Sequence, residues 1–200
     1  MGEPKKILDL RQVVFDAGIV LAEAVLIAAA QDFDDCTGYA STTEPTGAGN
    51  VTLTAVAARI EHPRNVVVTV SATNLTAGTC VVYGTGMNGI LTSETFTLTG
   101  TGTYTGNVPF LTVDRVVVYG CTGSLGASDE LSIGNGAKIG LPMPENARLV
   151  DVIKERFNAV DIAVTPANIN RTYGTYTPAS TLDGSKVLEI WYTVETLLNW

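Results

Sequence analysis

Short β-favouring segments, separated at intervals of roughly ten residues by turn-forming residues, constrain the fold of this chain more than any other feature. They run from Val51 to Pro142, and Gly, Asn, Pro or Asp stands in nearly every gap between them. This spacing is typical of an antiparallel β-sandwich or barrel. The predicted strands are Val51–Ala57, Asn65–Ala72, Thr79–Tyr83, Leu91–Leu98, Val113–Tyr119 and Glu130–Ile133.

The clearest local signal is a predicted hairpin around Asn88-Gly89. Asn-Gly supplies the positive φ angles that a two-residue type I′ turn requires, so Thr79–Tyr83 should pair antiparallel with Leu91–Leu98. In the second of these strands, threonines alternate with Phe96 and Leu98. The two apolar side chains should therefore lie on the buried face and the hydroxyls outside.

The same region contains a Gly-x-Gly-x-x-Gly match, formed by Gly84, Gly86 and Gly89. In a dinucleotide-binding fold the third glycine lies in a helix, and an acidic residue follows about 20 residues later. Here a β run follows instead, and the region from Asn107 to Phe110 has no acidic residue. The hairpin interpretation is therefore favoured, and no cofactor is predicted.

The charge composition argues against several classes of function. Among 200 residues there are 12 Lys and Arg against 20 Asp and Glu, whereas 27 are Thr. Nucleic-acid affinity depends on clustered Lys and Arg, so an acidic chain with a pI near 4.5 is not expected to bind it. Between Asn74 and Val113 the only charged residue is Glu94. Because charged residues normally protect sheet edges, we expect turns or a partner to cover this surface.

The first 45 residues leave two interpretations open. The apolar stretch Val13–Ala30, interrupted by Asp16 and Glu23, can form a mostly buried helix with one narrow polar stripe. It can also form two extended segments divided at Ala17-Gly18. The two acidic residues argue against an export signal, and the apolar runs are too short for a membrane span, so neither is expected.

The last part of the chain is expected to add strands to the body. A strand is predicted at Val187–Val194, with Val160–Val164 as its antiparallel partner. Two strands alone are marginal in water, so this zone either completes the first sandwich or exchanges with a partner chain. The predicted fold is mainly β: an antiparallel β-sandwich over 46–142, an N-terminal arm or helix over 1–45 and a C-terminal β-extension over 143–200.

The cysteines do not suggest a metal centre. Cys36, Cys80 and Cys121 are too scattered for a zinc site, and their odd number leaves at least one thiol free or bonded to another chain. Free cysteines usually behave as small buried hydrophobes, which is the expectation for all three. A disulfide between subunits through Cys36 is the alternative.

Two other features of the sequence resemble chemical sites. The only histidine, His62, precedes Pro63 and is expected in a loop. The acidic cluster of Asp32, Asp34 and Asp35 lacks the glycine and the terminal glutamate of an EF-hand loop, so a solvated turn is expected. No catalytic, metal-binding or cofactor-binding residue is therefore predicted, and the protein is not expected to be an enzyme.

Several segments together form a loose family pattern, which covers roughly residues 51 to 194 and contains no catalytic motif. They are His62–Val70, Thr79–Gly89, Ser93–Leu98, Tyr104–Phe110, Tyr173–Pro178, Asp183–Ser185 and Glu189–Tyr192. This pattern resembles the Ig-like or jelly-roll-like β-domain of structural proteins in tailed-bacteriophage particles, many of which are small and associated with the head.

The resemblance implies a capsid decoration or cement protein of the virion that binds the major capsid lattice and stabilises the head. The implied partners are the major capsid protein and further copies of this chain, with a trimer favoured. Neither nucleic acid, membrane nor a small-molecule substrate is expected. The candidate contact residues are Phe15, Val20, Leu26, Trp191, Tyr192 and Trp200.

A tail, baseplate or head-fibre component that binds a host-surface glycan or receptor is the alternative function. It would use the same sandwich but expose an aromatic groove. The candidates for such a groove are Tyr104, Tyr173, Tyr176 and Trp191.

Overall fold

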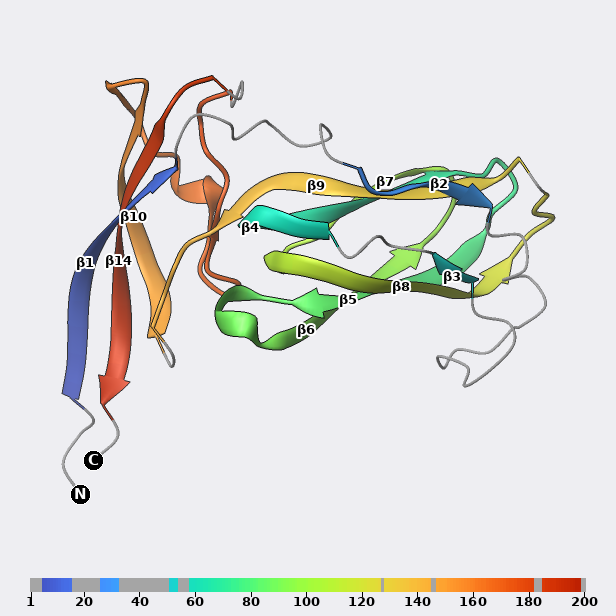
Figure 1. The fold of residues 1–200 in the computed structure, drawn as a ribbon, viewed down its shortest axis with the longest axis horizontal. Coiled ribbons are helices and arrows are strands. Elements are labelled where there is room, and N and C mark those ends of the chain that lie inside the picture. The colour runs from blue at the N-terminus through green and yellow to red at the C-terminus, as the bar shows by residue number, and fades with distance from the viewer. Residues whose placement is uncertain are drawn as a thin grey trace. The chain divides into compact units, whose positions relative to one another are not determined.

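The computed structural model describes residues 5–15, 26–32, 51–53, 58–126, 128–144, 147–181 and 185–198. Within these ranges the regular structure consists of β-strands and two short 3-10 helices, without an α-helix (Figure 1). The chain divides into two compact units: unit 1 is Met1–Leu21 with Ala137–Trp200, and unit 2 is Ala22–Gly136. The fold is mainly β, as predicted.

Unit 2 is an antiparallel sheet that curls over on itself into a sandwich-like body. Its strands are β2 Leu26–Asp32, β3 Val51–Leu53, β4 Ala58–Ser71, β5 Ala77–Thr85, β6 Leu91–Leu98, β7 Gly102–Thr105, β8 Phe110–Thr122 and the first part of β9 Glu130–Gly140. Hydrogen-bonded neighbours follow the order β9-β4-β8-β5-β6, with β2 added to β9, β3 to β8 and β7 to β4. In Figure 1, β9, β4, β7 and β2 form one layer and β8, β5, β6 and β3 the other.

Apolar side chains from both layers fill the interior of unit 2. One buried cluster includes Val68 of β4, Cys80 of β5, Phe96 of β6, Val116 of β8 and Ile133 of β9. Burial of such side chains contributes about 1.5 to 3 kcal/mol each. On β8 Val116 and Val118 belong to this cluster, whereas Val117 between them packs with Val81 and Tyr119 in a second buried cluster, so β8 is buried on both faces.

The predicted hairpin is confirmed in its pairing and wrong in its turn. β5 pairs antiparallel with β6, and Phe96 and Leu98 point into the core as expected. The connection is the longer loop Gly86–Ile90, which contains a 3-10 turn at Met87–Gly89 and is closed by a 2.8 Å hydrogen bond. Gly89 has a φ of 71°, whereas a type I′ turn needs positive φ at both central residues. The 3-10 geometry replaces it because the loop is longer than two residues.

The cysteines differ from one another. Cys121 is disulfide-bonded, which corrects the expectation of a free buried thiol at that position. Cys80 is free and fully buried, as expected. Cys36 lies outside the described residues. Burial raises the pKa of the Cys80 thiol to about 12, because the thiolate would lose its hydration.

We expect Cys80 to resist alkylation in the native protein. Iodoacetamide at about pH 8, near the pKa of an exposed thiol, should leave Cys80 unmodified and should modify it after unfolding in guanidinium chloride. The reagent attacks the thiolate, which burial both disfavours and shields. Peptide mass mapping reads the modified position directly. Native-state labelling of Cys80 at the rate of an exposed cysteine would contradict this burial.

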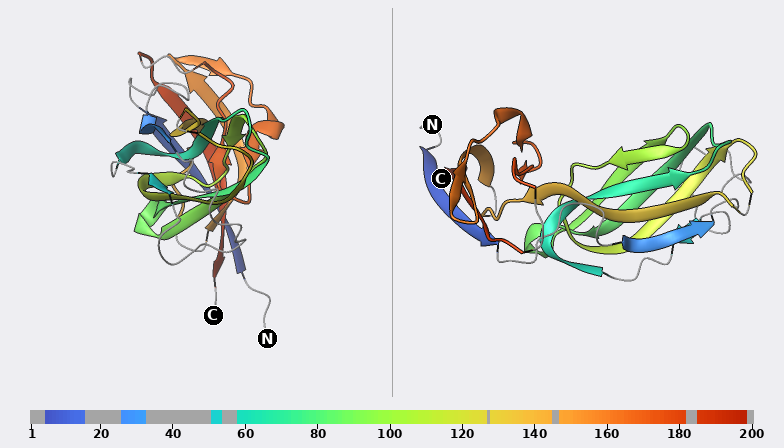
Figure 2. Two further views of the ribbon diagram at one scale, coloured as in Figure 1. Left: turned by 90° about the vertical axis from the view of Figure 1, so that its right-hand side faces the viewer. Right: turned by 90° about the horizontal axis from the view of Figure 1, so that it is seen from above.

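Unit 1 joins the two ends of the chain in one sheet. Its strands are β1 Lys5–Phe15, β10 Ala147–Phe157, β11 Val160–Ile162 and β14 Leu188–Leu198, in the order β1-β14-β10-β11 and all antiparallel. The blue β1 and the red β14 lie side by side in Figures 1 and 2. Two short strands, β12 Ile169–Asn170 and β13 Thr175–Tyr176, pair with each other, and β13 also pairs with the end of β9.

At the chain ends one open alternative is decided and one predicted pairing is corrected. β1 and β2 are extended, so at both described ends of Val13–Ala30 the extended interpretation holds and the helix does not. The C-terminal strand exists, but its neighbours are β1 and β10, whereas residues 160–162 form β11 beside β10. The buried cluster of unit 1 takes side chains from β1, β10 and β14 together. The C-terminal zone therefore builds a core with the N-terminal strand, because two strands alone cannot bury enough apolar surface.

A buried carboxylate holds the segment after β13 against β10. Glu155 is 0% exposed. Its side chain accepts hydrogen bonds from the Tyr176 hydroxyl at 2.6 Å, the Ala179 amide at 2.9 Å, the Ser180 amide at 3.0 Å and the Ser180 hydroxyl at 2.5 Å. Each of these four groups donates, which is the arrangement that an ionised carboxylate needs. Burial, together with the hydrogen bond to Glu155, raises the pKa of Tyr176.

Candidate interaction surface

The four-stranded sheet of unit 1 carries an exposed apolar row on β1. Leu8, Leu10 and Val14 are 65%, 62% and 50% exposed. They lie on one face because successive side chains of a strand alternate between faces. We call this the outer face of the sheet, since the alternate residues on β1 and β14 point toward the core of the unit. Exposed apolar rows on an otherwise well-packed sheet mark interaction surfaces.

Two charged residues of β1, Asp9 and Arg11, lie on the opposite, core-facing side. Asp9 pairs with Val194 and Arg11 with Tyr192, and both of these β14 side chains belong to the buried cluster. Residues directly opposite in an antiparallel pair share a face. Asp9 and Arg11 also form an ion pair with each other at 2.9 Å. In an ordinary surface strand the leucines would point to the core and the charged residues to solvent. Residues 8–11 of β1 have the opposite arrangement.

A tryptophan surrounded by cations continues the outer face on β14 and β10. Lys154 Nζ and Arg156 Cζ lie 5.2 and 5.4 Å from the centre of the Trp191 ring. Both cations also reach Asp161 of β11, at 2.8 Å. Hydrogen bonds from Lys154 and Arg156 hold the pKa of Asp161 below its usual value. Trp and Arg are the residues most enriched at the energetic centres of protein interfaces.

The predicted contact residues separate into three groups. Phe15 and Tyr192 are buried in the core of unit 1, and the Tyr192 hydroxyl donates to the Pro142 carbonyl at 2.5 Å, so neither offers a free contact surface. Trp191 lies on the outer face, partly covered by its cationic neighbours. Leu26 is in β2, where only its backbone is described. Val20 and Trp200 lie outside the described residues.

Sequence reasoning missed the apolar row of β1. The alternation Leu8-Asp9-Leu10-Arg11 is visible in the sequence and predicts a strand. The ordinary assumption would place its leucines in the core. Only the pairing with β14 shows that the leucines face outward, because Phe15 and Val13 at the end of the strand fix the face that meets the core.

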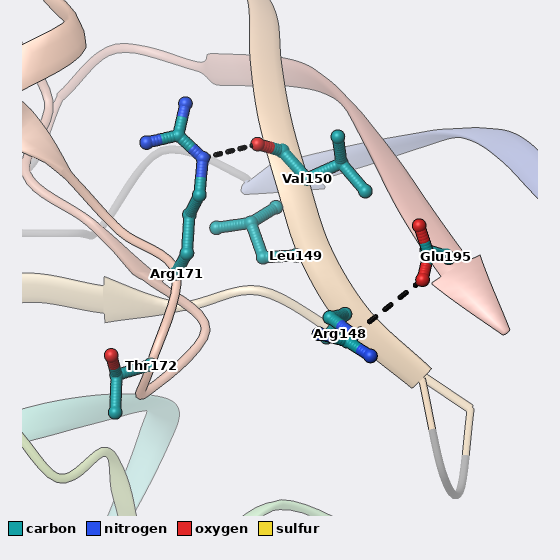
Figure 3. Close-up of a pocket in the computed structure, with 6 residues that line it drawn as sticks. All are labelled: Arg148, Leu149, Val150, Arg171, Thr172 and Glu195. Atoms are coloured by element: carbon teal, nitrogen blue, oxygen red, sulfur yellow. Dashed lines mark hydrogen bonds and ion pairs between the residues drawn. The ribbon is translucent and has the colours of Figure 1, made fainter. Parts of the chain in front are cut away.

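A shallow groove in unit 1 borders the outer face at Glu195, which pairs with Leu8 (Figure 3). It has a volume of about 480 Å³ and is lined by Arg148, Leu149, Val150, Arg171, Thr172 and Glu195. Arg148 points toward Glu195, at 3.7 Å, and Arg171 donates to the Val150 carbonyl at 2.5 Å and approaches Asp151 at 3.6 Å. Both guanidinium groups are thus engaged by acceptors of the chain itself. The groove is best described as a set of surface ion pairs, each worth about 0 to 1 kcal/mol.

Where the chain is described, the structure does not give the other residues considered as chemical sites, His62 and the acidic cluster, the surroundings of a metal site. His62 lies within β4, not in the predicted loop, at an irregularity in the pairing between β4 and β8. Asp32 ends β2, while Asp34 and Asp35 lie outside the described residues. Among the described residues, no group of three or more His, Cys, Asp or Glu side chains is placed to hold a metal ion.

The aromatic residues proposed for a glycan groove belong to different units, Tyr104 to unit 2 and the other three to unit 1. Tyr176 is fully buried. The Tyr104 hydroxyl accepts from the Thr99 amide at 2.8 Å and donates to the Gly100 carbonyl at 2.7 Å, so it holds a turn of unit 2. Tyr173 is 41% exposed in unit 1. The outer face is therefore the surface of unit 1 with the clearest features of an interface.

The search for relatives was negative. Neither protein-family models, curated protein sequences nor solved structures match this chain. In the part of the chain that the structure describes, no helix has both the length and the apolar character needed to cross a membrane.

Proposed function

We propose that this protein is a structural subunit of a tailed-bacteriophage particle, a decoration protein that docks on the major capsid lattice through the outer face of unit 1. The exposed apolar row of β1 is the observation that carries the proposal. Leu8, Leu10 and Val14 face solvent in the isolated chain. Full burial of three such side chains is worth several kcal/mol, which favours a covered surface over a bare one.

The rest of the outer face suits protein contact. Trp191 with Lys154 and Arg156 supplies an aromatic group and cations beside the apolar row. Interface centres combine apolar and aromatic side chains with arginine, surrounded by a polar rim. The choice of a capsid lattice as the partner rests on the resemblance of the sequence to phage-particle proteins. The curled β body of unit 2 suits a rigid exterior module.

Binding to particles that lack the protein tests this function. Purified chain is mixed with undecorated particles, and bound copies are counted by native mass measurement or cryo-electron microscopy. We expect one copy, or a small fixed number, for each capsid lattice position. A few copies at a vertex or on the tail would instead support the host-binding alternative, and no binding would overturn both.

Substitutions on the outer face test the docking surface. The double variant Leu8→Glu, Val14→Glu should bind the particles at least about tenfold more weakly, because burial of two apolar groups is replaced by burial of two charges. The matched control is Val160→Glu on β11, whose side chain is 59% exposed outside the apolar row. Equal binding of the wild-type chain and the double variant would exclude the outer face as the docking surface.

A further inference from the structure

The two edges of the unit 1 sheet are built differently. At one edge β11 has 3 residues, and short strands are a common way to prevent unwanted pairing. At the other edge β1 has 11 residues with neither Pro nor Gly, and it pairs with β14 at every position without a bulge. In the described part of the chain, no strand pairs with the second edge of β1. β1 is thus a long, regular strand, and over residues 6–14 its second edge meets no strand of the described chain.

From the charge pattern of β1 we infer that this edge pairs with the same edge of a second copy, antiparallel, about a two-fold axis at Leu10. This inference does not depend on the proposed capsid function. An antiparallel pair of identical edge strands forms a closed dimer, because residue i of one copy pairs with residue j of the other, and residue j pairs with residue i. The result is a dimer with one continuous eight-stranded sheet, unlike the trimer that the family resemblance implies.

The register follows from the side chains. With the axis at Leu10, Asp9 of each copy lies opposite Arg11 of the other, and the two Leu10 side chains face one another. Within each copy Asp9 and Arg11 already form an ion pair at 2.9 Å. Dimerisation would join the two ion pairs into one network of four charges that alternate in sign. Cross-strand pairs of opposite charge stabilise a sheet, and like charges directly opposite destabilise it.

The neighbouring registers place like charges directly opposite each other. An axis at Asp9 would set two Asp9 carboxylates against each other, and an axis at Arg11 would set two guanidinium groups against each other. Leu10 is also the midpoint of β1, Lys5–Phe15, so an axis here pairs more of the strand than an axis at any other residue. Charge complementarity and maximal backbone pairing therefore select the same arrangement.

Solution mass is the first test. Analytical ultracentrifugation or light scattering of the full chain over a concentration series should show a reversible monomer–dimer equilibrium. A single-chain mass at every concentration, or a trimer, would overturn the inference.

Charge exchange tests the register. Asp9→Arg alone and Arg11→Asp alone should each weaken the dimer at least about tenfold, since two attractive pairs become two repulsive ones. The double variant Asp9→Arg, Arg11→Asp restores opposite charges and should recover the wild-type dissociation constant within a few-fold. Circular dichroism checks that each variant is folded. A double variant as weak as the single ones would show that the two residues do not meet across the axis.

Cysteine cross-linking tests the axis independently of affinity. Leu10→Cys should give a covalent dimer under mild oxidation by oxidised glutathione, because the two thiols lie directly opposite. Leu8→Cys alone should not cross-link, whereas a mixture of Leu8→Cys and Gln12→Cys chains should, since these positions face each other in this register. Cross-linking of Leu8→Cys alone, or none by Leu10→Cys, would overturn the axis at Leu10. Val160→Cys, equally exposed on the short edge strand, is the control.

Discussion

Replacing Glu155 with Gln should lower the free energy of unfolding by about 3 kcal/mol. The carboxylate has no exposed surface and accepts all four of its hydrogen bonds from donors. Glutamine replaces one acceptor oxygen with an NH₂ group, which must then face donors. At least one donor pair, either Tyr176 with Ala179 or the two groups of Ser180, loses its acceptor. Urea unfolding followed by circular dichroism measures the change.

Two variants show whether the effect comes from the buried network. Tyr176→Phe removes one donor and should cost about 1 to 2 kcal/mol. Glu189→Gln removes a carboxylate from the next strand, where it pairs with Arg156 at 3.6 Å on the outer face, and should cost about 0.5 kcal/mol. If Glu155→Gln were as mild as Glu189→Gln, the buried carboxylate would not be what fixes the segment after β13.

Replacing Gly84 with Ala should destabilise unit 2 by about 3 kcal/mol or more. A Cβ atom at Gly84 would lie 1.9 Å from the Thr112 carbonyl oxygen of β8, and backbone atoms cannot move aside as a flexible side chain can. The pairing of β5 with β8 also shifts register between Tyr83 and Gly84. The glycine thus allows the two strands to approach at the irregularity. Denaturant unfolding of the purified variant provides the measurement.

The other two glycines of the Gly-x-Gly-x-x-Gly match are the controls. At Gly86 the nearest atom to an added Cβ is 3.5 Å away, an ordinary contact, so Gly86→Ala should change stability by less than about 1 kcal/mol. Gly89 has open space around it but a φ of 71°, so Gly89→Ala should cost about 1 kcal/mol in backbone strain. Equal effects at all three positions would contradict the separate roles that the hairpin gives them.

This glycine pattern shows how a motif can be read correctly from its context. A β run after the pattern excludes the helix of a dinucleotide site, and the structure places the three glycines in a β-hairpin. The close approach of Gly84 to β8 is invisible in the sequence, because Thr112 lies far along the chain. Local context therefore predicts the class of structure, and a distant strand determines the role of the individual residue.

On the outer face, too, the sequence predicts the type of residue and the distant strands determine its role. Trp191 was predicted as a contact residue and lies on the outer face, whereas Phe15 and Tyr192 were predicted with it and are buried. Aromatic residues serve equally well in cores and in interfaces, so residue type alone cannot separate the two. The neighbours across the strands decide between them.

The sequence by itself determined much of the local structure: β-favouring runs between turn residues predicted strands of the middle zone, Asn88-Gly89 predicted the β5–β6 pairing, and period-two alternation predicted the buried face of β6. Those features depend on interactions between residues close in the chain. Tertiary structure alone decided that β1 pairs with β14, that Glu155 is enclosed and that Leu8 and Leu10 face outward. Each of these depends on which distant strands meet, and a strand's own pattern shows that it has two faces without showing which neighbour will cover each.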